Sequence, residues 1–589
     1  MEKQTLMAVG LALVVLVVWQ VVVLGPQEQA RRASMLAARD SLLAAETRAP
    51  AMQESPRVSE AGAPSGGPGA PGGEAAGADG APGAATAAGA AGQAGALAPI
   101  ESGLPDAPVT IETDLFRAVL STRGARIGSL SLLKFPSHRG GVVDLVPEDG
   151  PGAFGLTLRT TSGNLVLDDF VFAVDYTSLP LTRGGAGAVT FSGEPLPGLH
   201  VTKRYAMRAG SYDWTMEIDV RSDAGAPAVS AYTLDLGAGL ALTEKDATED
   251  HGFLAGALRE DAGIRRKNLS GMKKGEELAW NGKIRWAAIT NKYFIVGLAP
   301  QGAPPLEVAM RPAAGARSIG LDLTVPLIAG ATAGRAISIF AGPQDFRLLE
   351  ASPLHMGEAI EFGWRLVQPI SQFLLWLMQA IYQLIPNYGV AIVLVSTAAK
   401  VAFYPLSHQG IKSMREMQKI QGELQALRDR HKGDPQRLNK ETMALYKKNK
   451  VNPMGGCLPM LLQMPVFIAL YNVLRRTIEL RQAPFGLWIQ DLASPDVVFT
   501  LPFTLPFVGN GVCVLPILMG ISTYFQQKMT AVDPKQKMLL WMMPIVMTLA
   551  FFRFPAGLVL YWLTNTLLTI AQQYLIERKE RSAPVAQAA

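Results

Sequence analysis

Long apolar runs divide this chain of 589 residues into regions of different periodicity. Residues 5–24 form an uncharged apolar run, which is long enough to span a bilayer core. Five further apolar segments follow in the last third of the chain, at 387–407, 456–475, 511–528, 538–553 and 556–576. We predict a multi-domain membrane protein with an N-terminal transmembrane anchor (1–25) and an all-α core of five transmembrane helices.

The first run has a second interpretation, a cleaved signal peptide. It is long for the apolar part of such a peptide, and no A-x-A-like cleavage site directly follows it, so we favour an uncleaved anchor. Residues 26–104 are mostly Ala, Gly and Pro and cannot form a core. We predict a disordered linker there.

Apolar residues recur at every second position between about 105 and 345. In WTMEIDV, for example, one face would carry Trp214, Met216, Ile218 and Val220. Clusters of Gly, Pro, Asp and Ser separate such runs. This pattern predicts a large all-β domain at 105–345, a β-sandwich.

Residues 362–386 are apolar enough to resemble a span, but their glutamines share one helical stripe. These are Gln368, Gln372, Gln379 and Gln383. The opposite face is aromatic and leucine-rich. We predict an amphipathic helix that lies at the membrane surface instead of crossing it.

The loops between apolar segments differ in charge, although the formal net charge is only +5. Residues 408–455 hold 11 Lys and Arg against 5 Asp and Glu, whereas the loop at 476–510 is acidic from Thr477 onward. The positive-inside rule places the first loop in the cytoplasm and the second in the periplasm. The same rule predicts cytoplasmic N- and C-termini, a periplasmic β domain and a short cytoplasmic tail at 577–589. Arg31 and Arg32, which follow the anchor, argue weakly for the reverse.

The basic loop is itself predicted to be a helical hairpin. Residues 414–427 carry an apolar stripe at spacings of three and four, which is typical of a helix. KGDP follows, and its Asp434 and Pro435 fit the N-cap and first turn of a second helix.

Ionisable residues are rare within the five apolar segments. None of the segments contains Asp, Glu or His, which argues against an ion-coupled transporter or an intramembrane protease. Lys400 is the one charge well inside them, and Ser396 shares its helical face at i−4. Snorkelling of Lys400 to the interface and a weak Ser–Lys dyad are alternatives. Neutral polar residues, including Gln463, Thr523 and Asn565, favour a hydrated cavity around the lysine.

Four stretches resemble the YidC/Oxa/Alb family of membrane protein insertases in its Gram-negative form. They are YPLS at 404–407, ALYKKNKVNPMGGCLPMLLQMPVFIALYNVL at 444–474, ELRQAPFGLWIQDL at 479–492 and FPAGLVLYWLTNTLLTIAQQYLI at 554–576. The resemblance implies an insertase and chaperone of the bacterial inner membrane, not an enzyme. It implies a hydrophilic groove open to the cytoplasm, which would accept nascent membrane proteins alone or with the Sec translocon. A transporter or a sugar-binding enzyme built on the β domain are the alternatives.

The resemblance also implies roles for particular residues. Lys400 matches the groove position that is usually arginine in the family, and Ser396, Tyr561 and Trp562 match substrate-contacting positions. Gln463, Thr523 and Asn565 would line the groove, and we expect Met464 and Phe467 at its apolar rim. Expected partners are the lipid bilayer, the Sec translocon with its accessory proteins, and the ribosome through the 408–455 hairpin, because the tail is short. No cofactor and no nucleic-acid sequence recognition are expected.

Overall fold

The computed structural model describes residues 96–582, except 183, 274, 303–305, 314–317, 328–334, 450, 452–457, 506–508 and 531–536. The predicted anchor, most of the predicted linker and most of the tail therefore lie outside the described residues. The chain divides into two compact units. The first runs to Asn291 and includes Leu298–Ser338, and the second comprises Lys292–Gly297 and the chain from Ile339 onward.

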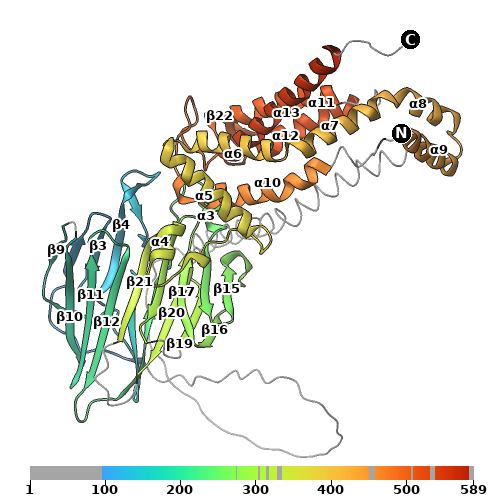
Figure 1. The fold of residues 1–589 in the computed structure, drawn as a ribbon. Helices are drawn as coiled ribbons and strands as arrows, with labels where there is room; N and C mark the ends of the chain where they lie inside the picture. The colour runs from blue at the N-terminus through green and yellow to red at the C-terminus, as the bar shows by residue number, and fades with distance from the viewer. Residues whose placement is uncertain are drawn as a thin grey trace, which may run out of the picture. The chain divides into compact units, whose positions relative to one another are not determined.

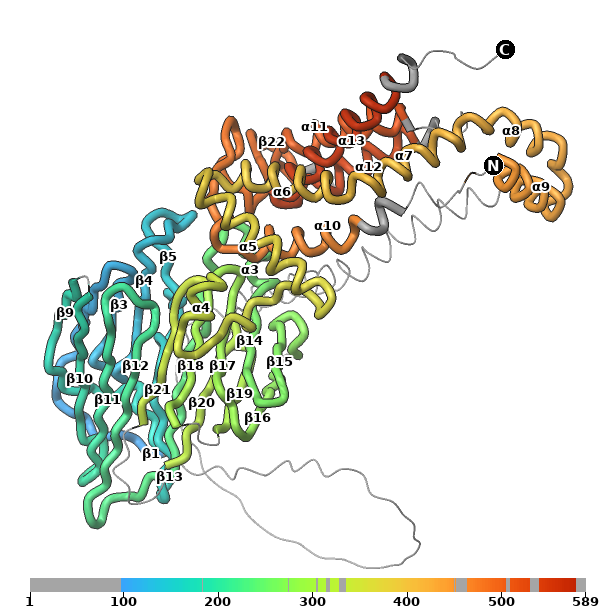
Figure 2. The backbone as a smooth tube through the Cα atoms, viewed as in Figure 1, coloured from blue at the N-terminus to red at the C-terminus, as the bar shows by residue number. Residues whose placement is uncertain are grey.

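The β region forms three sheets of mostly antiparallel strands (Figures 1 and 2), and the seven-stranded sheet contacts the nine-stranded sheet. In spatial order, the seven-stranded sheet contains β1 (Ala96–Leu97), β7 (Gly163–Val166), β6 (Gly155–Thr160), β13 (Val229–Asp235), β20 (Ile319–Pro326), β19 (Leu306–Pro312) and β16 (Leu278–Gly282). The nine-stranded sheet contains β15 (Gly263–Asn268), β14 (Ala255–Glu260), β17 (Ile284–Thr290), β18 (Phe294–Pro300), β21 (Arg335–Pro343), β12 (Asp213–Ser222), β11 (Leu199–Arg208), β10 (Ala186–Leu196) and β8 (Ala173–Val174). The five-stranded sheet contains β5 (Val142–Asp144), β4 (Arg126–Pro136), β3 (Phe116–Ser121), β2 (Pro108–Glu112) and β9 (Ser178–Pro180).

Residues predicted to be buried from the period-2 pattern are buried in this region. In β12, Trp214, Met216, Ile218 and Val220 are buried and alternate with more exposed neighbours. The ring of Trp214 packs edge-on against Phe154, with centroids 5.4 Å apart. One difference concerns the end of the predicted linker, because β1 pairs in parallel with β7.

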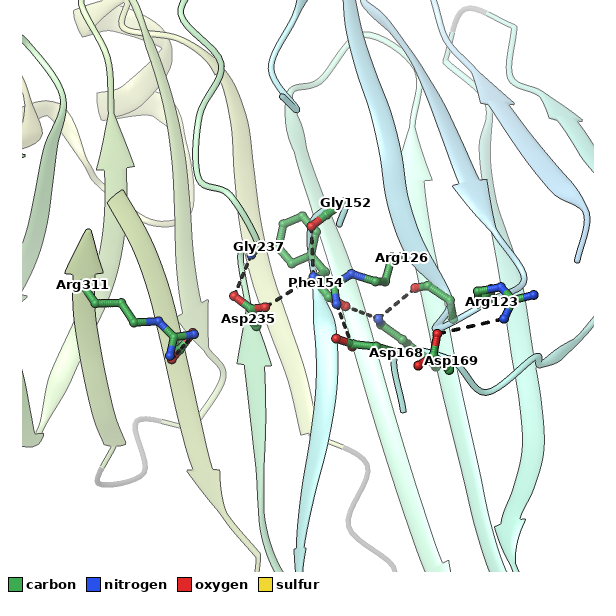
Figure 3. A network of polar contacts seen from close by, with 12 residues as sticks. Arg123, Arg126, Gly152, Phe154, Asp168, Asp169, Asp235, Gly237 and Arg311 are labelled. Carbon is green, nitrogen blue, oxygen red and sulfur yellow. Dashed lines mark hydrogen bonds and ion pairs between the residues drawn. The ribbon is translucent and has the colours of Figure 1, made fainter. Parts of the chain in front are cut away.

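A buried cation lies within the β unit (Figure 3). The guanidinium of Arg126 contacts Asp168 at 2.6 Å and Asp235 at 3.3 Å, and it donates a hydrogen bond to the carbonyl of Gly152 at 3.0 Å. The side chain of Lys203 is fully buried nearby and donates to the carbonyl oxygens of Ala125 and Phe154. Burial, and then the charge of Arg126, hold the pKa of Lys203 well below its usual value.

Beyond β21, the second unit comprises, in its described elements, helices and one hairpin. It contains α4 (Phe346–Ala351), α5 (Gln368–Leu384), α6 (Tyr388–Ala402), α7 (Tyr404–Lys419), α8 (Gln421–Arg430), α9 (Pro435–Lys448), α10 (Leu458–Arg476), β22 (Val497–Leu505), β23 (Gly509–Cys513), α11 (Val514–Thr530), α12 (Lys537–Phe551) and α13 (Ala556–Ser582). Helix α13 packs against α6, α10 and α11, and α12 packs on α11. Short helices η4 (Gly357–Ala359) and η5 (Ile478–Leu480) lie beside α4 and after α10, while α3 (Ala247–His251) and η2 (Leu269–Gly271) belong to the β unit.

The apolar segment at 387–407 is bent in the structure. Helix α6 ends at Ala402, and the YPLS motif opens α7 at an angle of 67° to it. Pro405 lies in the first turn of α7, where a missing amide donor is tolerated, and the residue before a proline is biased away from helical geometry. Among the described residues, no helix alone is long and apolar enough to count as a membrane span, and α6 with α7 forms the one bent pair that meets the criterion.

The basic loop forms the expected hairpin from α8 and α9. The side chain of Asp434 accepts a hydrogen bond from the amide of Arg437 at 3.0 Å, and Pro435 opens α9, so the predicted N-cap is confirmed. A small apolar cluster closes the hairpin, formed by Ile420, Leu424, Leu445 and Val451. The apolar stripe at 414–427 is shared by two helices, because α7 ends at Lys419.

Helix α5 exposes its aromatic face. Phe373 and Trp376 stack at 5.9 Å and are both more than half exposed, whereas Leu374, Leu375 and Met378 are buried. Gln379, on the glutamine stripe, is buried too. The exposed aromatic pair fits a helix at a membrane surface, where amphipathic rings are favoured.

Candidate functional site

Lys400 lies on α6, half-buried between helices. Its ammonium donates a hydrogen bond to the hydroxyl oxygen of Thr569 on α13 at 2.8 Å. Among the described residues it makes no ion pair, so its charge is not neutralised by a carboxylate. Removing a cation from water without a counter-charge is costly, and a single neutral hydroxyl offsets little of that cost.

Ser396 and Thr523 are buried but bond to their own helices. The Ser396 hydroxyl donates to the carbonyl of Ile392 at 2.6 Å, and the Thr523 hydroxyl donates to that of Met519 at 2.7 Å. The Ser396 hydroxyl and the Lys400 ammonium thus have different partners and form no hydrogen-bonded dyad. The serine thus extends the polar face of α6.

A second polar group connects α10 with α13. The side-chain amide of Gln463 donates to the hydroxyl of Tyr561 at 3.3 Å and to the carbonyl oxygen of Asn565 at 3.1 Å. Tyr561 and Asn565 are both buried. The structure therefore brings Gln463 into contact with two residues that lie about 100 positions further along the chain.

The expected apolar residues lie beside this group. The ring of Phe467 meets Trp562 edge-on at 5.2 Å, and Phe551 from α12 packs on the same indole at 5.3 Å. Met464 is 40% exposed. This arrangement presents an apolar surface next to polar side chains on the same pair of helices.

Sequence reasoning missed the partners on α13. Thr569 holds Lys400, the amide oxygen of Gln572 accepts from Ser407 at 3.1 Å, and the backbone carbonyl of Gln573 accepts from Arg415 at 3.2 Å. The available signal was the spacing of Asn565, Thr569, Gln572 and Gln573, which places them on one stripe of a helix. That stripe is the side of α13 that faces α6 and α7.

A compact loop joins several helix ends. Asp496 is buried, and its carboxylate accepts from the amides of Val514 and Leu515, at the start of α11, and from the indole of Trp488. The amide of Ala556, which begins α13, donates to the carbonyl of Ser494 at 2.8 Å. The amide side chain of Asn387, just before α6, donates to the carbonyl of Phe485 at 2.9 Å.

Glu479 in the same loop should make stability depend on pH. Its carboxylate accepts a hydrogen bond from Gln379 at 2.7 Å, and burial, and then the negative charge of Asp345, raise its pKa to about 7. The folded chain then holds a proton that the unfolded chain releases near its ordinary value of 4.5. The free energy of unfolding should therefore fall as pH rises from about 4.5 to about 7.

The change Glu479→Gln keeps the hydrogen bond and removes the titration. We expect equal thermal stability of the variant and the parent below about pH 4, and an advantage of about 3 kcal/mol for the variant above about pH 8. Thermal unfolding at both pH values measures this. The exposed Glu441→Gln serves as the control and should change neither curve. The same difference at both pH values would contradict the prediction.

Comparison with known proteins identifies the family. The model of the 60Kd inner membrane protein family matches residues 380–583, and that of the YidC periplasmic domain matches 108–377. The membrane protein insertase YidC of Pelobacter propionicus is 34% identical over 480 residues, which cover 80% of this chain and 86% of that protein. This chain belongs to the YidC family of membrane protein insertases. The YidC protein of Ralstonia nicotianae is 33% identical over 502 residues, covering 82% of this chain and 88% of its own.

YidC membership confirms the resemblance seen in the sequence. It makes the chain a bacterial inner membrane protein with a periplasmic β domain and a helical C-terminal region, and its family consists of insertases, not enzymes. Among solved structures, an active YidC insertase crystal structure covers 81% of this chain and 94% of its own at 17% identity and a TM-score of 0.36. A galactose mutarotase-like protein from Lactobacillus casei covers 40% and 99% at 14% identity and a TM-score of 0.28.

Proposed function

We propose that the helical unit inserts nascent membrane proteins through a hydrophilic groove that opens to the cytoplasm. The groove is lined by Lys400 and Ser396 from α6, Gln463 from α10, Thr523 from α11, and Tyr561 and Asn565 from α13. The observation that carries this proposal is the contact between the unneutralised ammonium of Lys400 and the neutral hydroxyl of Thr569 at 2.8 Å.

The chemistry of that contact suits a temporary ligand. A carboxylate of the substrate would add the attraction of an opposite charge, which the neutral hydroxyl of Thr569 lacks, so it would replace Thr569 favourably. Acidic or polar segments of a nascent chain are thus attracted to Lys400. The substrate's apolar segment passes over Met464, Phe467 and Trp562 into lipid. Partitioning into lipid and the membrane potential, which is worth about 2.3 kcal/mol per charge per 100 mV, supply the energy.

The proposed topology follows from the charges of the loops. Segments 387–407, 456–475, 511–528, 538–553 and 556–576 form the membrane core, residues 362–386 lie at the periplasmic interface, and both termini are cytoplasmic. The hairpin at 408–455 carries the basic charge expected of a ribosome contact. We further propose that the chain works alone on some substrates and with the Sec translocon on others.

Site-specific photocrosslinking to a stalled nascent chain tests the groove. We expect crosslinks from a photoreactive residue at Ser396, Lys400 or Tyr561, because these positions share the polar surface. Leu567 is the matched control, since it lies on α13 but is half exposed on another face. Equal crosslinking from Leu567, or none from the three groove positions, would refute the proposal.

A further inference from the structure

The hairpin of β22 and β23 displays apolar side chains that the described residues of the helical unit leave about half exposed. Val497 and Val498 are 45% and 47% exposed, and Phe499 and Phe503 are 56% and 58% exposed. Three consecutive apolar side chains, from Val497 to Phe499, are therefore exposed at the start of β22, where its pairing with β23 shifts register. In water, such a strand would be prone to aggregation.

The hairpin is also free of charge. From Val497 to Cys513 the sequence contains no Asp, Glu, Lys or Arg. A partner recognised through ion pairs therefore has nothing to bind here. The exposed polar groups of the hairpin include the hydroxyls of Thr500 and Thr504. These hydroxyls need hydrogen-bond partners, which a dry protein core would not supply, and they offer no charge to a charged surface.

The place of the hairpin in the chain indicates what covers it. β23 ends at Cys513 and α11 begins at Val514, without a linker. Helix α11 exposes Ile517, Leu518, Ile521 and Phe525, which are ordinary side chains for a helix of an inner membrane protein that faces lipid. The loop that carries the hairpin also joins the ends of α6 and α13, so the hairpin emerges at one end of the helical unit.

We propose that the β22–β23 hairpin is a lipid-docking element that lies in the interface of the outer leaflet, with Val497, Val498, Phe499 and Phe503 among the acyl chains. The insertion is shallow, because the hairpin is a two-stranded sheet whose outer edges carry unpaired backbone groups. Such groups are not tolerated in the hydrocarbon core and need headgroups or water. The exposed hydroxyls of Thr500 and Thr504 likewise need headgroups or water as hydrogen-bond partners.

A second copy of the chain is a poorer occupant. Four half-exposed Val and Phe side chains offer roughly 400 Å², about half of the ~800 Å² per partner that a stable protein interface buries. A lipid surface requires no such minimum and no shape complementarity. The inference rests on membrane residence and on the proposed topology, which places this loop on the periplasmic side, and it is independent of the groove proposed for Lys400.

Fluorescence quenching in vesicles tests the inference. The background is the full chain with Cys457→Ser and Cys513→Ser, reconstituted into vesicles of phosphatidylethanolamine and phosphatidylglycerol. An environment-sensitive nitrobenzoxadiazole label is attached at Val498→Cys or Phe503→Cys. Tyr176→Cys is the matched control, because Tyr176 is an equally exposed aromatic residue in the β unit. Only labelled variants whose thermal unfolding matches that of the unlabelled background are used. If one of the two hairpin variants does not match, the label is attached at Phe499→Cys instead.

Two quenchers distinguish the occupants. We expect nitroxide lipids to quench both hairpin labels several-fold more than the Tyr176 label, with iodide quenching them correspondingly less. A nitroxide near the headgroup should quench more than one near the chain end. Strong quenching by iodide at either hairpin label would place it in water and overturn the proposal. Protection from both quenchers would show that a protein covers the hairpin, which also overturns it, and stronger quenching by the chain-end nitroxide would overturn the shallow position.

Discussion

Replacing Lys400 with alanine is expected to lower the insertion of substrates that carry a charged exported segment by about tenfold. Among the described residues, the ammonium bonds to the neutral hydroxyl of Thr569 at 2.8 Å, and we expect it to accept a carboxylate of the substrate. A hydrogen bond to a charged group is worth about 1.5–3 kcal/mol, and each 1.4 kcal/mol corresponds to a factor of ten. Reconstituted insertion into proteoliposomes, with substrates that differ only in that charge, measures the loss.

Two matched variants separate charge from structure. Lys400→Arg keeps the cation and should preserve insertion, although arginine brings a planar fork in place of a point charge. Lys412→Ala removes an exposed lysine from the adjacent helix α7 and should have no effect. If Lys400→Ala inserts charged and uncharged substrates as well as the parent does, Lys400 has no electrostatic role.

Replacing Arg126 with methionine is expected to destabilise the β unit by about 3 kcal/mol. The variant loses the contacts to Asp168, Asp235 and the carbonyl of Gly152 seen in Figure 3. Asp168 keeps 41% of its side chain exposed, so water compensates part of the loss, and the cost stays at the lower end for a broken buried pair. Hydrogen exchange of the β4 and β6 amides should accelerate about 100-fold in the full chain.

The neighbouring strand supplies the control for this change. Arg117 on β3 also pairs with a carboxylate, Glu112 at 2.9 Å, but both side chains are about half exposed. Exposed ion pairs contribute little to stability. Arg117→Met should therefore change the hydrogen-exchange rates by less than threefold, and a threefold change corresponds to about 0.6 kcal/mol of stability. Equal effects of the two substitutions would mean that burial does not determine the contribution of Arg126.

Local pattern was sufficient for many elements of the chain, although not for the β22–β23 hairpin. Alternation placed Trp214 and Met216 inside a β-sheet region, because a strand with one buried face imposes a period of two. The Asp434–Pro435 pair marked the start of α9, because capping involves only the residues next to the helix end. The bend after Ala402 was missed, since the apolar composition continues through it.

Side-chain partners could not be predicted in the same way. The polar character of Gln463, Tyr561 and Asn565 is visible in the sequence, but their contact depends on how α10 packs against α13. The same applies to Arg126, which reads as one more surface arginine until β4, β6 and β13 assemble around it. Contacts between residues distant in the chain depend on how helices and strands pack. The same pattern of apolar and polar residues is compatible with more than one packing arrangement, so the pattern does not specify these contacts.

By itself, the sequence determined the order of regions, the all-β and helical character of the two units, the charge asymmetry of the loops and the family. These follow from local periodicity, composition and long motifs. Only the tertiary structure decided that Thr569 receives the Lys400 ammonium, that Asp496 caps α11, and that the hairpin beginning at Val497 exposes its apolar side chains. The physical reason is that hydrogen bonds and burial depend on distance in space, and the chain reveals only distance along itself.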